Sequence, residues 1–138
     1  CDVYSPCALG ATINDDTIER LKCKVVAGCA NNQLAENRHG DILKEKGILY
    51  APDYLINAGG LMNVSIEFEG WSEDKATRMV DTIYDTTLEI FKKSDKDDIP
   101  VHQATDLLAE QRIQSIKNIK GRYLGRLAHR FPGRKKLI

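Results

Sequence analysis

The sequence predicts an α/β fold: a parallel sheet with crossover helices, followed by long carboxyl-terminal helices. Three short apolar stretches, at residues 2–4, 24–28 and 48–50, are separated by turn and helix patterns. Strands that alternate with helices in this way form parallel sheets with right-handed crossovers. In the second half, apolar residues recur at helical spacing over 73–93 and again from Val101. This half is therefore expected to consist of two long helices.

The elements of the first half follow from local signals. Asn14 and two aspartates precede residues 17–21, which is the pattern of a capped helical turn. A second short helix is expected at residues 41–46, ended by Gly47, a residue suited to the position after a helix. The third strand runs into a proline followed by Asp53, which is expected to act as a helix N-cap.

The two predicted long helices lie between the sheet region and a basic tail, so the chain has three regions. Ser72 can cap the first of them, and residues 94–98 are expected to form a polar loop closed by a proline. After Gly121 the apolar residues no longer recur at helical spacing, and a turn is expected at residues 131–133, before a basic carboxyl terminus. We therefore expect a sheet domain at residues 1–70, helices at 71–120 and a flexible basic tail at 121–138.

Charge gives little indication of a partner. The formal net charge is zero, so overall charge favours neither nucleic acid nor a membrane surface. The distribution is uneven, because residues 112–138 hold nine Lys and Arg and no acidic residue. A basic tail can bind polyanions. Few aromatic residues accompany these charges, so we expect a solvated terminus and do not expect nucleic acid as a partner.

The sequence also indicates where the protein is located and what state its cysteines are in. No apolar stretch approaches the ~20 residues that cross a bilayer, and no signal peptide is visible, so a cytoplasmic location is expected. The chain begins at Cys1, without Met and on a strand pattern, which indicates a piece of a longer protein. The four cysteines are spaced more widely than zinc ligands usually are, so no metal is expected. They are expected to be free thiols, with Cys23 and Cys29 buried.

Small or polar residues follow each predicted strand, at residues 7–10, 30–33 and 57–60. In a doubly wound sheet such turns lie side by side along the carboxyl edge. Small residues let a flat ring approach, and amide side chains offer donors and acceptors, so the pattern indicates a nucleotide-like ligand. The sequence contains no Gly-x-Gly-x-x-Gly, the phosphate-binding turn of dinucleotide folds.

Plainer interpretations stay open for these residues. Asn31 and Asn32 can form a turn through local backbone hydrogen bonds. Gly59 and Gly60, each of which weakens a helix by roughly 0.5–1 kcal/mol relative to alanine, can serve close helix packing instead of a ligand. His39 is expected only to cap or to pack.

Four ordered runs carry a resemblance to a known family: residues 1–11, 26–34, 38–40 and 50–60. Through them the chain, over residues 1–120, resembles the carboxyl-terminal part of the glutamate/leucine/phenylalanine/valine dehydrogenases. The resemblance implies the second half of a Rossmann-like NAD-binding domain. It also implies helices that return toward an amino-terminal catalytic domain, and a homo-oligomer.

The reaction implied by the resemblance is NAD-dependent oxidative deamination of an L-amino acid, of leucine or branched-chain type, to a 2-oxo acid and ammonia. In the family, one lysine of the amino-terminal domain is the base and a second holds the substrate carboxylate. Neither segment is in this sequence, so no catalytic residue is assigned, and the isolated chain is expected to be inactive. The alternative is a truncated, non-enzymatic remnant that acts as a binding or oligomerisation module.

The resemblance also assigns site residues. Five of them line the cofactor site: Cys7, Ala8, Ala30, Asn31 and Asn32. Asn32 also reaches the substrate, and amides of this kind fix the nicotinamide ring for hydride transfer at one face. Leu61 and Val64 line the side-chain pocket. Because Val64 offers a distal carboxylate no hydrogen bond, the pocket is expected to favour aliphatic side chains.

Overall fold

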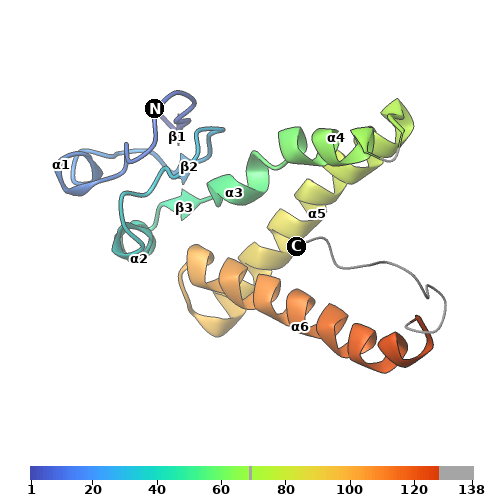
Figure 1. The fold of residues 1–138 in the computed structure, drawn as a ribbon. Coiled ribbons are helices and arrows are strands. Elements are labelled where there is room, and N and C mark those ends of the chain that lie inside the picture. The colour runs from blue at the N-terminus through green and yellow to red at the C-terminus, as the bar shows by residue number, and fades with distance from the viewer. Residues whose placement is uncertain (69, 128–138) are drawn as a thin grey trace, which may run out of the picture. The chain divides into compact units, whose positions relative to one another are not determined.

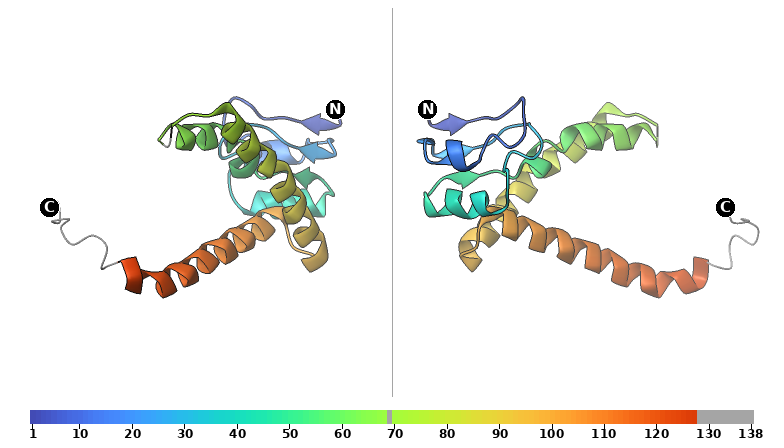
Figure 2. Two further views of the ribbon diagram at one scale, coloured as in Figure 1. Left: turned by 90° about the vertical axis from the view of Figure 1, so that its right-hand side faces the viewer. Right: turned by 60° about the vertical axis from the view of Figure 1, so that its left-hand side comes forward.

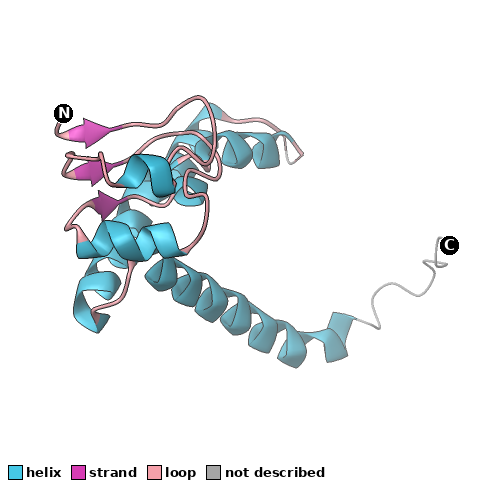
Figure 3. Ribbon diagram, turned by 90° about the vertical axis from the view of Figure 1, so that its left-hand side faces the viewer, coloured by secondary structure: helices cyan, strands magenta, loops and turns pink. Residues whose placement is uncertain are grey.

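The computed structural model describes residues 1–68 and 70–127. Its sheet has three parallel strands in the order β1 (Val3–Tyr4), β2 (Val25–Val26) and β3 (Leu49–Tyr50) (Figure 1). Because the strands run in the same direction, the loops that follow them all leave from one edge of the sheet (Figure 3). The predicted α/β fold is confirmed, although each strand is only two residues long.

Two short helices, α1 (Asp15–Ile18) and α2 (Arg38–Glu45), pack against each other, and α2 packs against β3. α1 begins two residues earlier than predicted, because the Asn14 side chain accepts hydrogen bonds from the backbones of Asp16 (3.0 Å) and Thr17 (3.1 Å). α2 also begins three residues early, and the residue after its C-cap is the predicted Gly47. The core consists of Ile13, Ile18, Cys23, Val26, Leu43, Ile48 and Tyr50.

Helices α1 and α2 are joined at Asp15. Arg38 donates to its carboxylate at 2.6 Å, and Nε2 of the buried His39 donates to it at 3.2 Å. Since a carboxylate cannot donate, Nε2 carries the proton, and Nδ1 of His39 accepts the backbone N–H of Glu36 at 3.0 Å. His39 therefore has the packing role expected for it.

The hydrogen bonds at Asp15 make part of the free energy of unfolding sensitive to acid. The Arg38 hydrogen bond, with that of His39, lowers the pKa of Asp15 from 3.8 to about 2. A carboxyl whose pKa falls on folding stabilises the protein above its unfolded pKa, and this contribution is lost as the pH falls through the folded pKa. We expect the urea midpoint to fall between about pH 4 and pH 2, and that fall to be smaller in Asp15→Asn. If the urea midpoints of the wild type and Asp15→Asn fell by the same amount, the contacts described for Asp15 would be contradicted.

Four helices follow β3: α3 (Asp53–Ile56), α4 (Gly59–Glu67), α5 (Glu73–Asp97) and α6 (Val101–Leu127). α4 packs against α5, and both views of Figure 2 show the two helices side by side. Residues 1–105 form one compact unit, and a second unit begins at Asp106, within α6. The predicted succession of a sheet and long helices is present.

Residues 94–98 were predicted as a loop, but residues 94–97 continue α5 instead. Lys93 pairs with Asp97 one turn later at 2.8 Å, and the Ser94 hydroxyl donates to the carbonyl of Ile99 at 2.6 Å. The helix ends only at Asp97, and its C-cap Asp98 has a left-handed φ of 51°. The prediction was wrong because charged residues are typical both of a loop and of the exposed face of a helix.

The helix ends differ from expectation in two further places. Ser72 occupies the N-cap position of α5, but its side chain makes no capping hydrogen bond. α6 continues through Gly121 to Leu127, while the predicted turn at 131–133 and the end of the basic tail lie outside the described residues. No helix in the described part of the chain is long and apolar enough to cross a membrane.

Candidate functional site

The loops that follow β1 and β2 are tied together along the carboxyl edge of the sheet. We call them the β1 loop (residues 5–12) and the β2 loop (residues 27–34). The backbone N–H of Ala30 donates to the carbonyl of Pro6 at 2.9 Å. A hydrogen bond between the loops fixes their relative position, which makes this edge of the sheet a preorganised surface.

Gly28 allows the two loops to approach this closely. A Cβ atom at Gly28 would overlap the carbonyl oxygen of Pro6 and lie 2.5 Å from its nitrogen. Gly10 on the β1 loop is similar, since a Cβ there would lie 2.7 Å from the carbonyl oxygen of Asn31. Neither glycine has a positive φ. Their role is therefore space, because backbone packs directly against backbone.

A buried carboxylate joins the β2 loop to β3. Asp53 accepts hydrogen bonds from the backbone N–H of Gln33 at 3.1 Å and from the Tyr50 hydroxyl at 3.0 Å. All three residues are buried. Burial raises the pKa of Tyr50, so its hydroxyl stays protonated and donates. The predicted N-cap role of Asp53 is wrong: it is the first residue of α3, and its side chain binds the β2 loop instead.

Amide side chains meet at the same edge. Asn57, which follows α3, donates to Oδ1 of Asn31 at 2.5 Å and to the carbonyl of Cys29 at 3.4 Å. Beneath them Gln33 donates to the carbonyl of Ala30 at 3.0 Å. These bonds brace the β2 loop. They also leave Nδ2 of Asn31 as a donor for a ligand, because among the described residues only its oxygen is engaged.

The predicted cofactor residues lie together on these two loops. Cys7, Ala8, Asn31 and Asn32 are exposed, whereas Ala30 is buried. Asn32 has a left-handed φ of 54°, which asparagine tolerates better than most residues. Its side chain makes no hydrogen bond with the described part of the protein. The amide of Asn32 is therefore available to a ligand.

The predicted substrate residues Leu61 and Val64 lie on α4. Their spacing places them on one face of the helix, and their exposed fractions are 74% and 47%. Gly59 and Gly60 begin this helix, and a Cβ at Gly60 would meet nothing within 4 Å. Close helix packing therefore does not account for Gly60, and the space beside it is open to a ligand.

Sequence reasoning missed the residues that hold this edge together. Gln33 and Asn57 appear in the sequence only as polar residues in turns, and Asp53 as a cap. The available signal is position: Gln33 and Asp53 follow β2 and β3, and Asn57 follows α3, so all three lie where backbone groups need hydrogen-bond partners. A long-range partner for a buried polar residue at a strand end is a better expectation than a local turn.

The cysteines are free thiols, as expected. Cys23 is buried as predicted, but Cys29 is exposed, so that prediction is wrong. Cys29 belongs to the β2 loop, beyond the buried end of the strand. Within residues 1–68 and 70–127, no three His, Cys, Asp or Glu side chains are grouped so that they could hold a metal ion.

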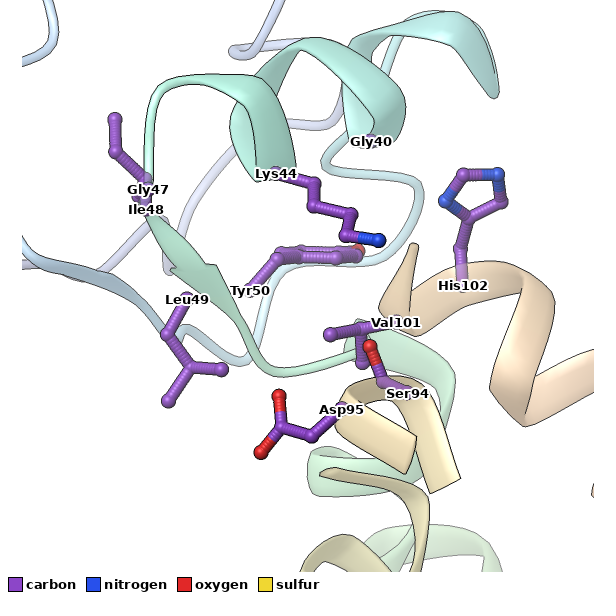
Figure 4. A pocket seen from close by; sticks show the side chains of 10 residues that line it. All are labelled: Gly40, Lys44, Gly47, Ile48, Leu49, Tyr50, Ser94, Asp95, Val101 and His102. Atoms are coloured by element: carbon purple, nitrogen blue, oxygen red, sulfur yellow. The ribbon is translucent and has the colours of Figure 1, made fainter. Parts of the chain in front are cut away.

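A cavity of about 190 Å³ lies beside α2 and β3, away from the loops (Figure 4). Its lining includes Gly47 and Ile48, which precede β3, so it lies toward the amino end of that strand. His102 fills part of the wall, and a Cβ at Gly40 would lie 2.9 Å from Cε1 of its ring. None of the predicted site residues lines this cavity, so we assign it to packing.

Comparisons with known proteins agree with these observations. The sequence profile of the glutamate/leucine/phenylalanine/valine dehydrogenases matches residues 1–121. Leucine dehydrogenase of Bacillus cereus is 56% identical over 124 residues, and phenylalanine dehydrogenase of Thermoactinomyces intermedius is 43% identical over 120. The matches cover 90% and 87% of this chain but 34% and 33% of those proteins. The chain thus spans about a third of the length of the curated relatives it matches.

Solved structures show the same similarity. L-tryptophan dehydrogenase from Nostoc punctiforme matches with a TM-score of 0.82 and 47% identity, over 85% of this chain and 35% of that one. The hetero-hexameric glutamate dehydrogenase from Thermus thermophilus, in its Leu bound form, matches with a TM-score of 0.69 and 19% identity. It covers 86% of this chain and 30% of that one, and at this identity it shows a shared fold alone.

Proposed function

Because the chain belongs to the glutamate/leucine/phenylalanine/valine dehydrogenase family, we propose that it forms the carboxyl-terminal part of an NAD-dependent L-amino acid dehydrogenase of leucine type. The proposed reaction is oxidative deamination to a 2-oxo acid and ammonia. Relatives that are 56% and 55% identical to this chain are leucine dehydrogenases, which supports the substrate class. The observation that carries the proposal is the unengaged amide of Asn32 on a loop braced by buried hydrogen bonds.

In this proposal the chain supplies one wall of the site. When bound, NAD would supply the hydride acceptor for the α-carbon of the amino acid. Asn31 and Asn32 orient the nicotinamide, and Asn32 also contacts the substrate. Cys7 and Ala8 line the ribose side of the edge. The exposed amides fit a ligand with both donors and acceptors, such as a carboxamide or a ribose.

Substrate preference in the proposed site depends on α4. Leu61 and Val64 present an apolar face, exposed in this chain, to the substrate side chain. A distal carboxylate would lose its water there without gaining a hydrogen bond, which is costly. Aliphatic amino acids are therefore the proposed substrates.

The isolated chain is proposed to be inactive. In the family the base and the lysine that holds the substrate carboxylate belong to the amino-terminal domain, so this chain would contribute only binding and orientation. The full enzyme is proposed to be a homo-oligomer. A steady leucine-dependent formation of NADH by the purified 138-residue chain would contradict this part of the proposal.

A chimera tests the proposed function. The 124 matched residues of this chain would replace the corresponding third of Bacillus cereus leucine dehydrogenase, which supplies the remaining segments. We expect the chimera to form NADH with leucine, and to prefer leucine over glutamate. A chimera that folds and binds NAD, yet oxidises no aliphatic amino acid, would overturn the proposal and favour a non-enzymatic module.

Gly60→Ala is expected to have opposite effects on the stability of α4 and on the use of the space beside it by a substrate. In the isolated chain we expect the free energy of unfolding to rise by about 0.5–1 kcal/mol, because alanine favours a helix and the new Cβ meets nothing. In the chimera we expect kcat/KM for leucine to fall about 10- to 100-fold, because the same methyl group enters the substrate space. Unchanged kcat/KM would show that this space does not serve the substrate.

A further inference from the structure

Two exposed thiols lie on the adjoining loops of the carboxyl edge. Cys7 belongs to the β1 loop and Cys29 to the β2 loop. The Cys29 sulfur lies 4.0 Å from the carbonyl oxygen of Cys7, and the neighbouring Ala30 donates its N–H to Pro6 at 2.9 Å. These contacts hold the two cysteines on directly adjoining backbone, as the formation of a disulfide requires.

The two thiols differ in acidity in the way that a reactive pair does. The backbone N–H of Cys29, the hydroxyl of Ser5 and the Cys29 thiol all hold the pKa of Cys7 below its ordinary value. Ser5 Oγ lies 3.3 Å from the Cys7 sulfur. The pKa of Cys29 is raised, because its thiol donates to Cys7 and its own ionisation would place two negative charges together. Cys7 therefore ionises first, as a nucleophile must.

The other two cysteines lack this arrangement. Cys23 is buried in the core, with an exposed fraction of 5%, so oxidants reach it poorly. Cys1 is exposed at the amino terminus, and in the described part of the chain no hydrogen bond joins it to another thiol. One pair out of the four cysteines is thus both accessible and adjacent.

We propose that Cys7 and Cys29 are a redox-active pair that forms a reversible disulfide with a hydroperoxide as the oxidant. The Cys7 thiolate attacks one peroxide oxygen, the O–O bond breaks, and the departing alkoxide takes a proton to give an alcohol. Cys7 is then a sulfenic acid. The Cys29 sulfur attacks the Cys7 sulfur, the S–S bond forms, and the hydroxyl group leaves as water with the Cys29 proton. Two thiols are oxidised and one hydroperoxide is reduced.

The disulfide would link the β1 and β2 loops across the candidate cofactor edge. It would also remove the Cys7 thiol from the surface that the proposed function assigns to the cofactor. This consequence for catalysis rests on the proposed function, whereas formation of the disulfide depends only on the positions of the two thiols. The test below therefore measures the covalent bond itself.

The reduced full chain would be treated with one equivalent of tert-butyl hydroperoxide and analysed by intact mass and by tryptic mapping without reductant. We expect the loss of two hydrogens and a link between peptides 1–20 and 25–38, which dithiothreitol reverses. Cys1→Ser is the matched control, because it removes the second thiol of the first peptide. We expect it to form the link at the wild-type rate, and Cys7→Ser to form it at least about tenfold more slowly.

Several results would overturn the proposal. One is a chain that gains oxygen without losing two hydrogens. Another is a link that forms as fast in Cys7→Ser as in the wild type, or that forms faster in urea than in the folded chain. Since the readout is a mass and not turnover, these results leave the proposed dehydrogenase function untouched. An inactive chimera would likewise leave the disulfide untouched.

Discussion

Gly28→Ala is expected to lower the free energy of unfolding by about 3 kcal/mol, at the upper end of the usual cost of overpacking. The added Cβ would overlap the carbonyl oxygen of Pro6, which also accepts the hydrogen bond from Ala30. Relief of the overlap therefore separates the β1 loop from the β2 loop. Urea unfolding followed by circular dichroism measures the loss as a lower midpoint.

Gly60→Ala is the matched control for this substitution. It adds the same methyl group at a glycine where a Cβ meets nothing, and is expected to stabilise the chain. If Gly28→Ala were as stable as the wild type, the two loops would not be packed together as described. In that case the carboxyl edge would not be a single surface.

Asp53→Ala is expected to destabilise the protein by about 3 kcal/mol. The substitution leaves two buried donors, the N–H of Gln33 and the hydroxyl of Tyr50, without their acceptor. Each unsatisfied buried group costs about 1–3 kcal/mol. Because the β2 loop loses its attachment to β3, hydrogen exchange at Gln33 is expected to accelerate together with the loss of stability.

Two further variants make this test specific. Asp53→Asn keeps one acceptor oxygen and is expected to cost about half as much, since one of the two donors remains satisfied. Asp16→Ala removes an exposed carboxylate from a first helical turn and is expected to change stability by less than about 0.5 kcal/mol. Equal stability of Asp53→Ala and Asp16→Ala would contradict the buried network.

The sheet was predictable because its signals are local. The apolar run at Val25 and Val26 and the cap at Asn14 each specify an element within a few residues, and alternation of elements then requires parallel strands. The position of the candidate site follows from the same reasoning, because the loops after parallel strands share one edge. Its polar residues were therefore expected together before their contacts were known.

The bracing of that edge was not predictable from local pattern. Asp53 and Gln33 are 20 residues apart, and their contact is between a side chain and a backbone N–H, which no residue spacing encodes. The exposure of Cys29 depends on how far the β2 loop extends beyond its strand. The charged end of α5 was predicted as a loop because polar composition does not distinguish a loop from an exposed helical face.

Oxidation of leucine by the chimera carrying Asn32→Gly shows whether the amide at the carboxyl edge of the sheet serves the reacting ligands. Glycine keeps the left-handed backbone, with its φ of 54°, and removes only the amide. We expect kcat/KM to fall about 10- to 100-fold while the unfolding midpoint stays close to that of the parent chimera. The control Asn37→Ala, at an exposed amide that makes no capping hydrogen bond to α2, is predicted to leave kcat/KM unchanged. Equal kcat/KM in both variants would contradict the assignment of this edge to the reacting ligands.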